Sequence, residues 1–221
     1  MERNMDGQLE DLKGLILLMG GYVEKALLLV STALINKDSS LFPEVHLIEQ
    51  KINQEQIQVD NACMGLLAKQ SPVAKDLRLI LSIIRINTDL ERMGDQSVNI
   101  AYLGREYLLA NTKHDLTDFF RMSEVSQQMV KISLDSFLRS DVGLAKKVLQ
   151  MDDEVDFLKN KIFSEMVSYI KQNPQDVEPS LNLVIMARNL ERLGDHATNI
   201  AEDVIFAYTG QDIRHGGRFG G

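Results

Sequence analysis

One twelve-residue stretch occurs twice in this chain of 221 residues, as LERMGDQSVNIA at residues 90–101 and as LERLGDHATNIA at residues 190–201. Eight of the twelve positions are identical in the two copies. Two shorter matches precede them in the same order: KQSP at 69–72 corresponds to KQNP at 171–174, and EQKIN at 49–53 corresponds to DDEVD at 152–156. Such internal similarity is the signature of a duplicated structural unit. The sequence therefore predicts two homologous halves that meet near residues 111–114.

Each half is predicted to form three helices. Apolar residues recur at intervals of three and four, Gly and Pro are rare, and no alternating strand pattern competes. In the first half, breaks are expected at residues 36–42 and 70–72, with Ser71 as the N-cap of the third helix and Pro72 as its first residue. In the second half, breaks are expected at 140–141 and 173–179, with Asp176 as a cap and Pro179 in a first turn.

The predicted fold is all-α, with two tandem homologous three-helix bundles made of six long helices and short up-down connections. We assign residues 1–112 to the first bundle and residues 113–209 to the second. The remaining segment, residues 210–221, holds five glycines and two arginines and is predicted to be a disordered tail.

Composition narrows the possible functions. The chain has 24 Lys and Arg against 32 Asp and Glu, a net charge of −8, which argues against nucleic-acid binding because that needs a basic surface. The single cysteine, Cys63, excludes an internal disulfide and indicates a reducing compartment such as the cytoplasm. The most apolar stretch, residues 15–30, is interrupted by two glycines and by a Glu-Lys pair. No membrane span is therefore predicted, and any membrane contact is expected only through partners.

The duplicated stretch also carries an acidic stripe on the third helix of each half. Its members step by four residues and lie roughly opposite the apolar stripe on a helical wheel, so they are predicted to face outward. They are Glu91, Asp95 and Asn99 in the first half and Glu191, Asp195 and Asn199 in the second. Like charges at this spacing repel each other, so helix stability does not explain why both halves carry them.

A matching motif with the same spacing lies on the second helix of each half, as Glu49 and Asn53 in the first and as Asp152 and Asp156 in the second. Counting from Pro72 or Pro174 as the turn of an antiparallel hairpin places the two motifs of each half at one height. Carboxylate and amide oxygens gathered there suit hard or borderline cations such as Mg, Mn or Fe. The sequence therefore predicts an open, shallow metal site in each half, with one or several ions.

Two alternatives to a metal site stay open for these acids. Either they form a solvated helix face, or Arg92, Arg188 and Arg192 absorb their charge in exposed ion pairs that contribute under about 1 kcal/mol each. His196 lies beside the second motif, where a lone histidine is more often a surface residue than a metal ligand.

The doubled ERxGD pattern with its following NIA, preceded by PVAKDLR at residues 72–78, resembles the PhoU family of bacterial phosphate-uptake regulators. The resemblance covers nearly the whole chain outside the tail. It implies two three-helix bundles whose acidic motifs bind multinuclear iron or zinc clusters, or Mg or Mn, on outer helix faces. It also implies a cytoplasmic, often homodimeric accessory protein that acts with the phosphate ABC transporter, including its ATPase, and with a phosphate-sensing histidine kinase. Such proteins hold the phosphate-starvation response off when phosphate is plentiful.

The sequence departs from the family pattern in two places. Asn53 stands where the motif has an acid, so we expect the first metal site to be weaker than the second, which has four carboxylates. The second half has EPSLN at residues 178–182 in place of the segment around Asp76 and Arg78. That segment is expected either to dock a partner or to serve only as the first turn of a helix.

Three classes of function follow from the sequence. The leading one is a non-enzymatic regulator that docks on other proteins, because no nucleophile with a partnered base, glycine-rich phosphate loop or dinucleotide-binding turn is visible. The resemblance implies that this regulator binds metal and acts negatively on phosphate uptake. The second is a metal-dependent hydrolase whose carboxylates hold two metal ions. The third is a structural helical adaptor whose acids are merely solvated.

Overall fold

Six long helices build the computed structural model, which describes residues 4–70 and 72–214. They are α1 (Asn4–Asn36), α2 (Phe42–Lys69), α3 (Ala74–Leu109), α4 (Thr117–Arg139), α5 (Val142–Gln172) and α6 (Val177–Thr209), with short 3-10 turns at Ser39–Leu41 and Pro174–Asp176. No strand occurs in the described residues. The all-α prediction of six helices is confirmed.

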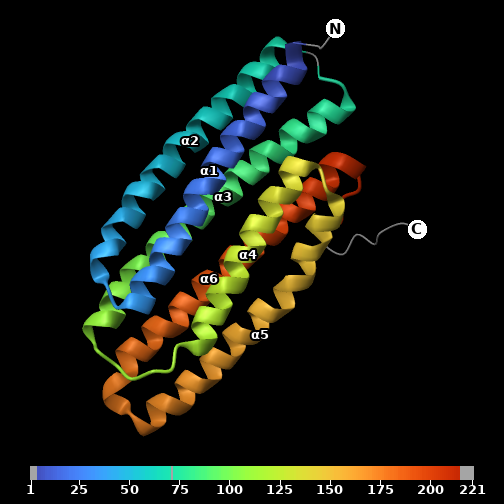
Figure 1. The fold of residues 1–221 in the computed structure, drawn as a ribbon. Helices are drawn as coiled ribbons and strands as arrows, with labels where there is room; N and C mark the ends of the chain where they lie inside the picture. Colours follow the sequence, from blue (N-terminus) through green and yellow to red (C-terminus); the bar gives the residue numbers. More distant parts are fainter. Residues whose placement is uncertain (1–3, 71, 215–221) are drawn as a thin grey trace.

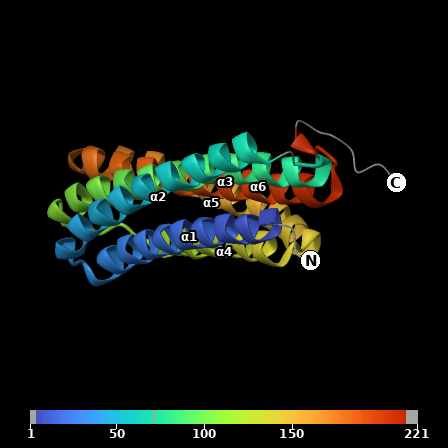
Figure 2. The same ribbon diagram turned by 90° about the horizontal axis from the view of Figure 1, so that it is seen from above.

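The helices form two bundles, α1–α3 and α4–α6, which lie side by side (Figure 1). The largest contact between the bundles is that of α3 with α6, and α1 meets α4 in a second contact. Seen from above, α1 and α4 form one layer and the other four helices lie behind it (Figure 2). Hydrogen bonds from Ser82 to the Asp203 carbonyl and between Asp89 and His196 show that α3 and α6 run antiparallel.

The helix ends lie close to the predicted breaks, with one correction. Ser71 and Pro72 were predicted to begin the third helix, but α3 begins at Ala74 and its N-cap is Val73. Val73 has an extended backbone, and its carbonyl accepts the first helical bond, from the Leu77 N–H at 2.9 Å. The helix can therefore start only after Val73. Ser71 lies outside the described residues.

Asp176 is the N-cap of α6, as predicted, but its side chain does not cap the helix. Its carboxylate accepts a hydrogen bond from the Tyr169 hydroxyl at 2.9 Å, which ties the start of α6 to the end of α5. Pro179 lies in the first turn of α6, where the missing N–H of proline breaks no helical bond.

The apolar stripes of the helices form the core of each bundle. Leu90, Met93 and Ile100 of the first repeat are fully buried, as are Leu193 and Ile200 of the second. In α1 the same kind of stripe is so apolar that this helix alone, among the described residues, is long and apolar enough to cross a membrane. Burial against α2, α3 and α4 accounts for that composition equally well.

The link between the bundles runs from 110 to 116, and the boundary assigned between residues 112 and 113 lies within it. Of the predicted tail, residues 210–214 are described. Ile213 packs against the core, and the Arg214 guanidinium lies 3.7 Å from the carboxylate of the buried Asp203. Residues 215–221 lie outside the described part of the chain.

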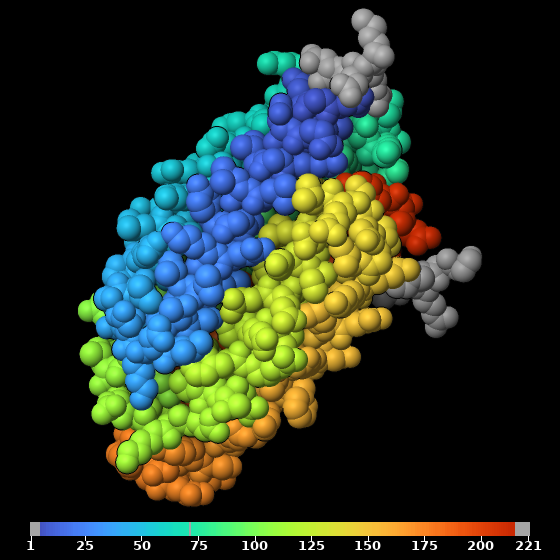
Figure 3. Space-filling model, in the orientation of Figure 1, coloured from blue at the N-terminus to red at the C-terminus, as the bar shows by residue number. Residues whose placement is uncertain are grey.

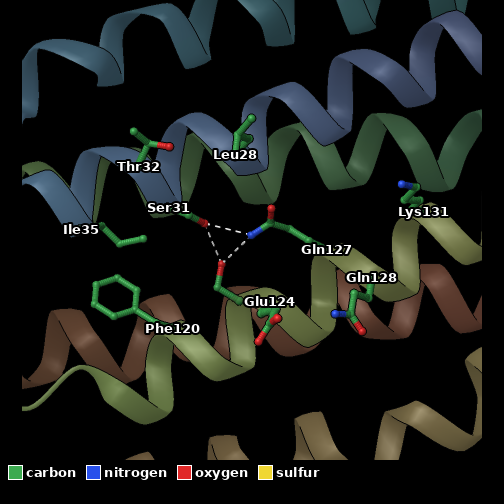
Figure 4. Close-up of a pocket in the computed structure, with 10 residues that line it drawn as sticks. Leu28, Ser31, Thr32, Ile35, Phe120, Glu124, Gln127, Gln128 and Lys131 are labelled. Atoms are coloured by element: carbon green, nitrogen blue, oxygen red, sulfur yellow. Dashed lines mark hydrogen bonds between the residues drawn. The ribbon is translucent and has the colours of Figure 1, made fainter.

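A seam between α1 and α4 crosses the face seen in Figure 3. At its floor, the hydroxyls of Ser31 and Ser123 are 2.8 Å apart, and the Gln127 amide donates to both at 3.1 Å (Figure 4). Leu28, Ile35 and Phe120 are among the residues that line the pocket above them, which has a volume of about 340 Å³. Further along the seam, Gly20 of α1 lets α4 approach closely.

The two adjacent glycines of α1 give a test of this contact. Gly21→Ala should raise the free energy of unfolding by about 0.5–1 kcal/mol, because Ala favours the helix and no atom lies within 4 Å of the added Cβ. Gly20→Ala has the same backbone gain, but its Cβ would lie 2.5 Å from Leu134 Cδ1 of α4. It should therefore be less stable than Gly21→Ala by about 1–3 kcal/mol in urea unfolding. Equal stabilities would show that α4 is not held against α1 at this point.

Candidate metal centre

Each copy of the repeat has a glycine where the second helix of its half packs on the third. A Cβ on Gly94 would lie 3.1 Å from Ile52 Cδ1 of α2, which is a tight contact. A Cβ on Gly194 would lie 3.5 Å from Asp152 Oδ1 and from Val155 Cγ1 of α5, which is an ordinary van der Waals contact. Glycine inside a helix costs about 1 kcal/mol relative to alanine, and close approach is a physical reason for it at Gly94. The same contact brings the acidic motifs of neighbouring helices together.

In the second half, the structure brings all four predicted carboxylates together between α5 and α6. Asp152 interacts electrostatically with Asp156, Glu191 and Asp195, which places the four groups in one cluster. Lys159 of α5 lies within it, with its Nζ 3.3 Å from both Asp156 Oδ1 and Glu191 Oε1. The single ammonium group of Lys159 therefore neutralises only part of the negative charge of the four carboxylates. We call these four acids the second cluster.

Two acids of the second cluster have raised pKa values. Burial, and then the charge of Asp195 and Asp156, raises the pKa of Asp152 from 3.8 to about 6. Burial, followed by the charge of Glu191 and Asp156, also raises the pKa of Asp195. The folded chain thus holds like charges close together, which favours the neutral, protonated forms of these acids. A bound cation would relieve the repulsion between the ionised carboxylates.

In the first half, Glu49 and Asn53 of α2 lie against Glu91 and Asp95 of α3, and we call these four residues the first cluster. The Asn53 amide donates to Glu49 Oε1 at 2.5 Å. Burial, and then the charge of Asp95, raises the pKa of Glu91, and Glu49 adds to the effect. Arg92 offsets part of this charge, at 3.5 Å from Glu91 and 3.6 Å from Asp95. The glutamates are less exposed than an outward stripe implies: the side chains of Glu49 and Glu91 are 13% and 19% exposed.

The two asparagines at the end of the acidic stripes lie elsewhere. The Asn199 amide donates to Asp89 of α3 at 3.2 Å, and Asn99 lines a cleft between α3 and α6. Each step of four residues turns a helix position by about 40°, so the third member of a stripe has rotated about 80° away from the first. His196 also turns toward α3, with its Nδ1 2.8 Å from Asp89 Oδ1.

The donor chemistry of both clusters suits a hard cation, although the side chains are not arranged as a finished coordination shell. Within residues 4–70 and 72–214, no group of three or more His, Cys, Asp or Glu side chains is close enough to hold one ion. Mutual repulsion and the ion pairs with Lys159 and Arg92 explain why the carboxylates stay apart. Asn53 Oδ1 is buried without a hydrogen-bond partner, so the first cluster also holds an unused oxygen ligand. A cation would satisfy that oxygen and the surplus charge together.

Sequence reasoning missed Lys159 and Asp89. Lys159 follows Asp156 by three residues, a spacing at which opposite charges pair on a helix, so this signal was available. Asp89 lies outside both acidic motifs, and its contacts with His196 and Asn199 depend on how α3 packs against α6. No spacing within one helix reveals it.

Comparisons with known proteins agree with the fold and the repeat. A family model of the PhoU domain matches the chain twice, at residues 16–103 and 119–204. The "phosphate-specific transport system accessory protein PhoU homolog" of Pseudomonas aeruginosa is 38% identical over 218 residues, which cover 97% of this chain and 89% of the relative. The PhoU protein of Escherichia coli K12, which has the same accessory-protein name, is 31% identical over 212 residues, covering 96% of this chain and 88% of the relative.

Two solved structures share the architecture. The crystal structure of PhoU from Pseudomonas aeruginosa has a TM-score of 0.90 and 38% identity, and the match covers 94% of this chain and all of that one. The phosphate transport system regulatory protein PhoU from Streptococcus pneumoniae has a TM-score of 0.88 at 26% identity, covering 95% and 99% of the two chains. The prediction of two tandem three-helix bundles is confirmed by these matches.

The raised pKa of Asp152 predicts a change of stability with pH. Between about pH 4 and 6 the folded chain holds a proton on Asp152 that the unfolded chain has lost, so this contribution to stability falls as the pH rises through 6. Asp152→Asn stays neutral and should therefore stabilise the chelator-treated protein at pH 7 by about 1 kcal/mol, after allowance for solvent screening, and by little at pH 4. Urea unfolding at both pH values measures this.

The matched control is Glu106→Gln, which removes an exposed carboxylate of α3 that is not among the charges acting on Asp152. It should leave the pH dependence of stability close to that of the unchanged chain. An equal effect of the two substitutions at pH 7 would mean that only the overall charge matters and that the acids of the second cluster do not repel each other.

Proposed function

The chain belongs to the PhoU family, and from this membership we propose that it is an accessory protein that represses phosphate uptake and the phosphate-starvation response when phosphate is abundant. One observation carries the proposal: relatives named phosphate-specific transport system accessory proteins match 96–97% of the chain at 31–38% identity. Both copies of the acidic repeat lie inside the two matched PhoU domains. The duplicated surface therefore belongs to what the chain shares with the family.

We propose that the protein works by binding other proteins and catalyses no reaction. Its partners are the ATPase of a phosphate ABC transporter and a phosphate-sensing histidine kinase, and it meets the membrane only through them. It acts in the cytoplasm, as a homodimer. The single buried cysteine and the net charge of −8 support this location and argue against nucleic acid as a partner.

We further propose that both clusters bind metal ions, of Fe or Zn, or of Mg or Mn. Glu49, Asn53, Glu91 and Asp95 would hold ions in the first half, and Asp152, Asp156, Glu191 and Asp195 in the second. A bound cation would supply positive charge between α2 and α3 and between α5 and α6. The chain's own residues prepare the position: Gly94 lets α2 approach α3 closely, and Lys159 and Arg92 neutralise part of the acidic charge in the absence of metal.

Deleting the gene should leave phosphate-uptake genes expressed at high phosphate. The motivation is the family membership, and the measurement is a transporter-promoter reporter in rich phosphate, with and without the gene restored on a plasmid. Capture of the transporter ATPase and the kinase on the immobilised full chain tests the partners separately. Normal repression in the deletion strain would contradict the regulator proposal, and phosphatase activity that depends on added Mn would favour the hydrolase instead.

Lys159→Gln should strengthen metal binding at the second cluster. The Lys159 ammonium lies 3.3 Å from two of the four carboxylates and competes with an incoming cation, so its removal should lower the Kd for Mn²⁺ by about fivefold. Isothermal titration of the chelator-treated full chain measures this, and Asp156→Ala with Asp195→Ala identifies the site.

The matched control for this prediction is Lys161→Gln, because Lys161 lies two residues away but pairs with Asp118, at 2.7 Å. Its effect on the Kd should be small. Equal strengthening by the two substitutions would assign the effect to overall charge. If the unchanged chain binds none of Mn²⁺, Fe²⁺ and Zn²⁺, the metal-site proposal is wrong and the acids form a solvated helix face.

A further inference from the structure

The groove between α3 and α6 contains two clefts that are equivalent by the internal repeat. The first, of about 560 Å³, is lined by the N-terminal part of α3 and the C-terminal part of α6, and the second, of about 310 Å³, by the opposite parts of the same helices. Six lining positions of one cleft correspond to six of the other at the offset of 100 residues that relates the duplicated stretches. The duplication has therefore produced two clefts lined by equivalent helix positions, so the residue types at these positions can be compared one by one.

The first cleft contains more acidic than basic residues, three against two. Its arginines, Arg85 and Arg214, both lie near the carboxylate of the buried Asp203, at 3.0 and 3.7 Å. Asp89 and Glu202 line the same cleft, and Asp89 is already engaged by His196 and Asn199. Its cationic groups are thus balanced by acids of the chain.

The second cleft has lost every one of these acids. Asn189, Tyr102 and Leu103 stand where the first cleft has Asp89, Glu202 and Asp203. Arg188 stands where the first cleft has Thr88, and Arg192 joins it one helical turn further along α6. The second cleft therefore has two guanidinium groups and no carboxylate among its lining residues, in a chain whose net charge is −8.

Neither of these arginines has a carboxylate partner in the described part of the chain. The nearest acids in sequence interact with other groups: Glu191 is 3.3 Å from Lys159 of α5, and the charges that act on Asp195 are those of Glu191, Asp156, His196 and Lys159. Arg92 is the counterpart of Arg192 in the first half, and it pairs with acids on both sides. The exposed, unpaired state of Arg188 and Arg192 is thus particular to the second cleft.

We propose that the cleft formed by Asn99, Tyr102, Arg188 and Arg192 binds a phosphate dianion, either free or as the phosphate group of a small ester. Side chains four residues apart on a helix are about 6 Å apart, so both guanidinium groups can reach one tetrahedral anion. Arginine forms paired hydrogen bonds to phosphate oxygens that are roughly twice as strong as neutral ones. The Asn99 amide and the Tyr102 hydroxyl add uncharged donors at the rim.

The inference goes beyond the proposed function and does not depend on it. It concerns Arg188 and Arg192 and not the carboxylates of the second cluster, which lie within a turn of them on the same helix, and it requires neither a metal ion nor a protein partner. If the chain does not bind phosphate in vitro, the proposal that it represses phosphate uptake in cells still stands. If it does not repress phosphate uptake, the proposal that the cleft binds an anion still stands.

Isothermal titration of the full chain with inorganic phosphate tests the proposal, with AMP in a second series. The protein is first treated with a chelator, so that no cation on the acidic clusters can hold phosphate in place of the arginines. We expect saturable binding of one anion per chain, weakened at least about tenfold in Arg188→Gln with Arg192→Gln. Arg188→Lys with Arg192→Lys keeps the charge but loses the paired hydrogen bonds, and should lie between the two.

The matched control is Arg139→Gln with Lys147→Gln, which removes two exposed positive charges far from the cleft in sequence and should bind as the unchanged chain does. Binding of AMP but not of inorganic phosphate, lost in the double glutamine variant, would support the site and identify a phosphate ester as its ligand. Binding of neither anion, equal binding in the double glutamine variant, or equal loss in the control would overturn the proposal. Circular dichroism confirms that each variant is folded.

Discussion

The close antiparallel contact of α3 with α6 is the constraint on which the rest of the molecule depends. Hydrogen bonds from Ser82 to Asp203 and between Asp89 and His196 set its register. In this register residues 90–95 lie opposite residues 190–195, so the two copies of the repeated stretch face each other over about half their length. The contact is also the largest between the two bundles. It therefore fixes how the two repeats lie relative to each other.

Packing within each bundle explains why the acidic motifs lie where they do. Burial of the apolar stripe between three helices leaves Glu91 and Glu191 at the seam between neighbouring helices, half-covered but outside the core. Gly94 lets α2 pack closely on α3, and in both halves the acids of two neighbouring helices interact. Charge gathered at such a seam raises pKa values and costs stability, as the pKa of about 6 for Asp152 shows. Because both halves carry an acidic cluster that lowers the stability of the fold, these clusters point to a role other than folding.

The helices and their breaks could be predicted from the sequence, because they depend on the spacing of apolar and turn residues. Contacts that depend on how one helix packs against another could not. Apolar spacing and turn residues predicted six helices and their breaks, because both are local properties. The two motifs of the second half lie together, as counting along the hairpin predicted, because helices have a fixed rise per residue. Asn199 was misplaced because a step of four residues drifts around the helix, so its amide reaches Asp89 of α3 and not the second cluster. The start of α3 was predicted two residues early because Val73 holds an extended backbone that no residue preference reveals.

The two halves have kept one scaffold and diverged in charge, and helix α6 shows why this matters. Helix α6 contributes Glu191 and Asp195 to an acidic cluster, and within the same two turns its Arg188 and Arg192 line a cleft against α3. Lys159 holds Glu191 toward α5, and without it Glu191 would be free to pair with Arg188 three residues earlier on the same helix. A cation at the cluster would hold Glu191 in the same way, and its positive charge would add to the potential felt by an anion in the cleft. Glu191 thus stays apart from Arg188 because Lys159 holds it, and either a cation at the cluster or an anion in the cleft would strengthen this separation.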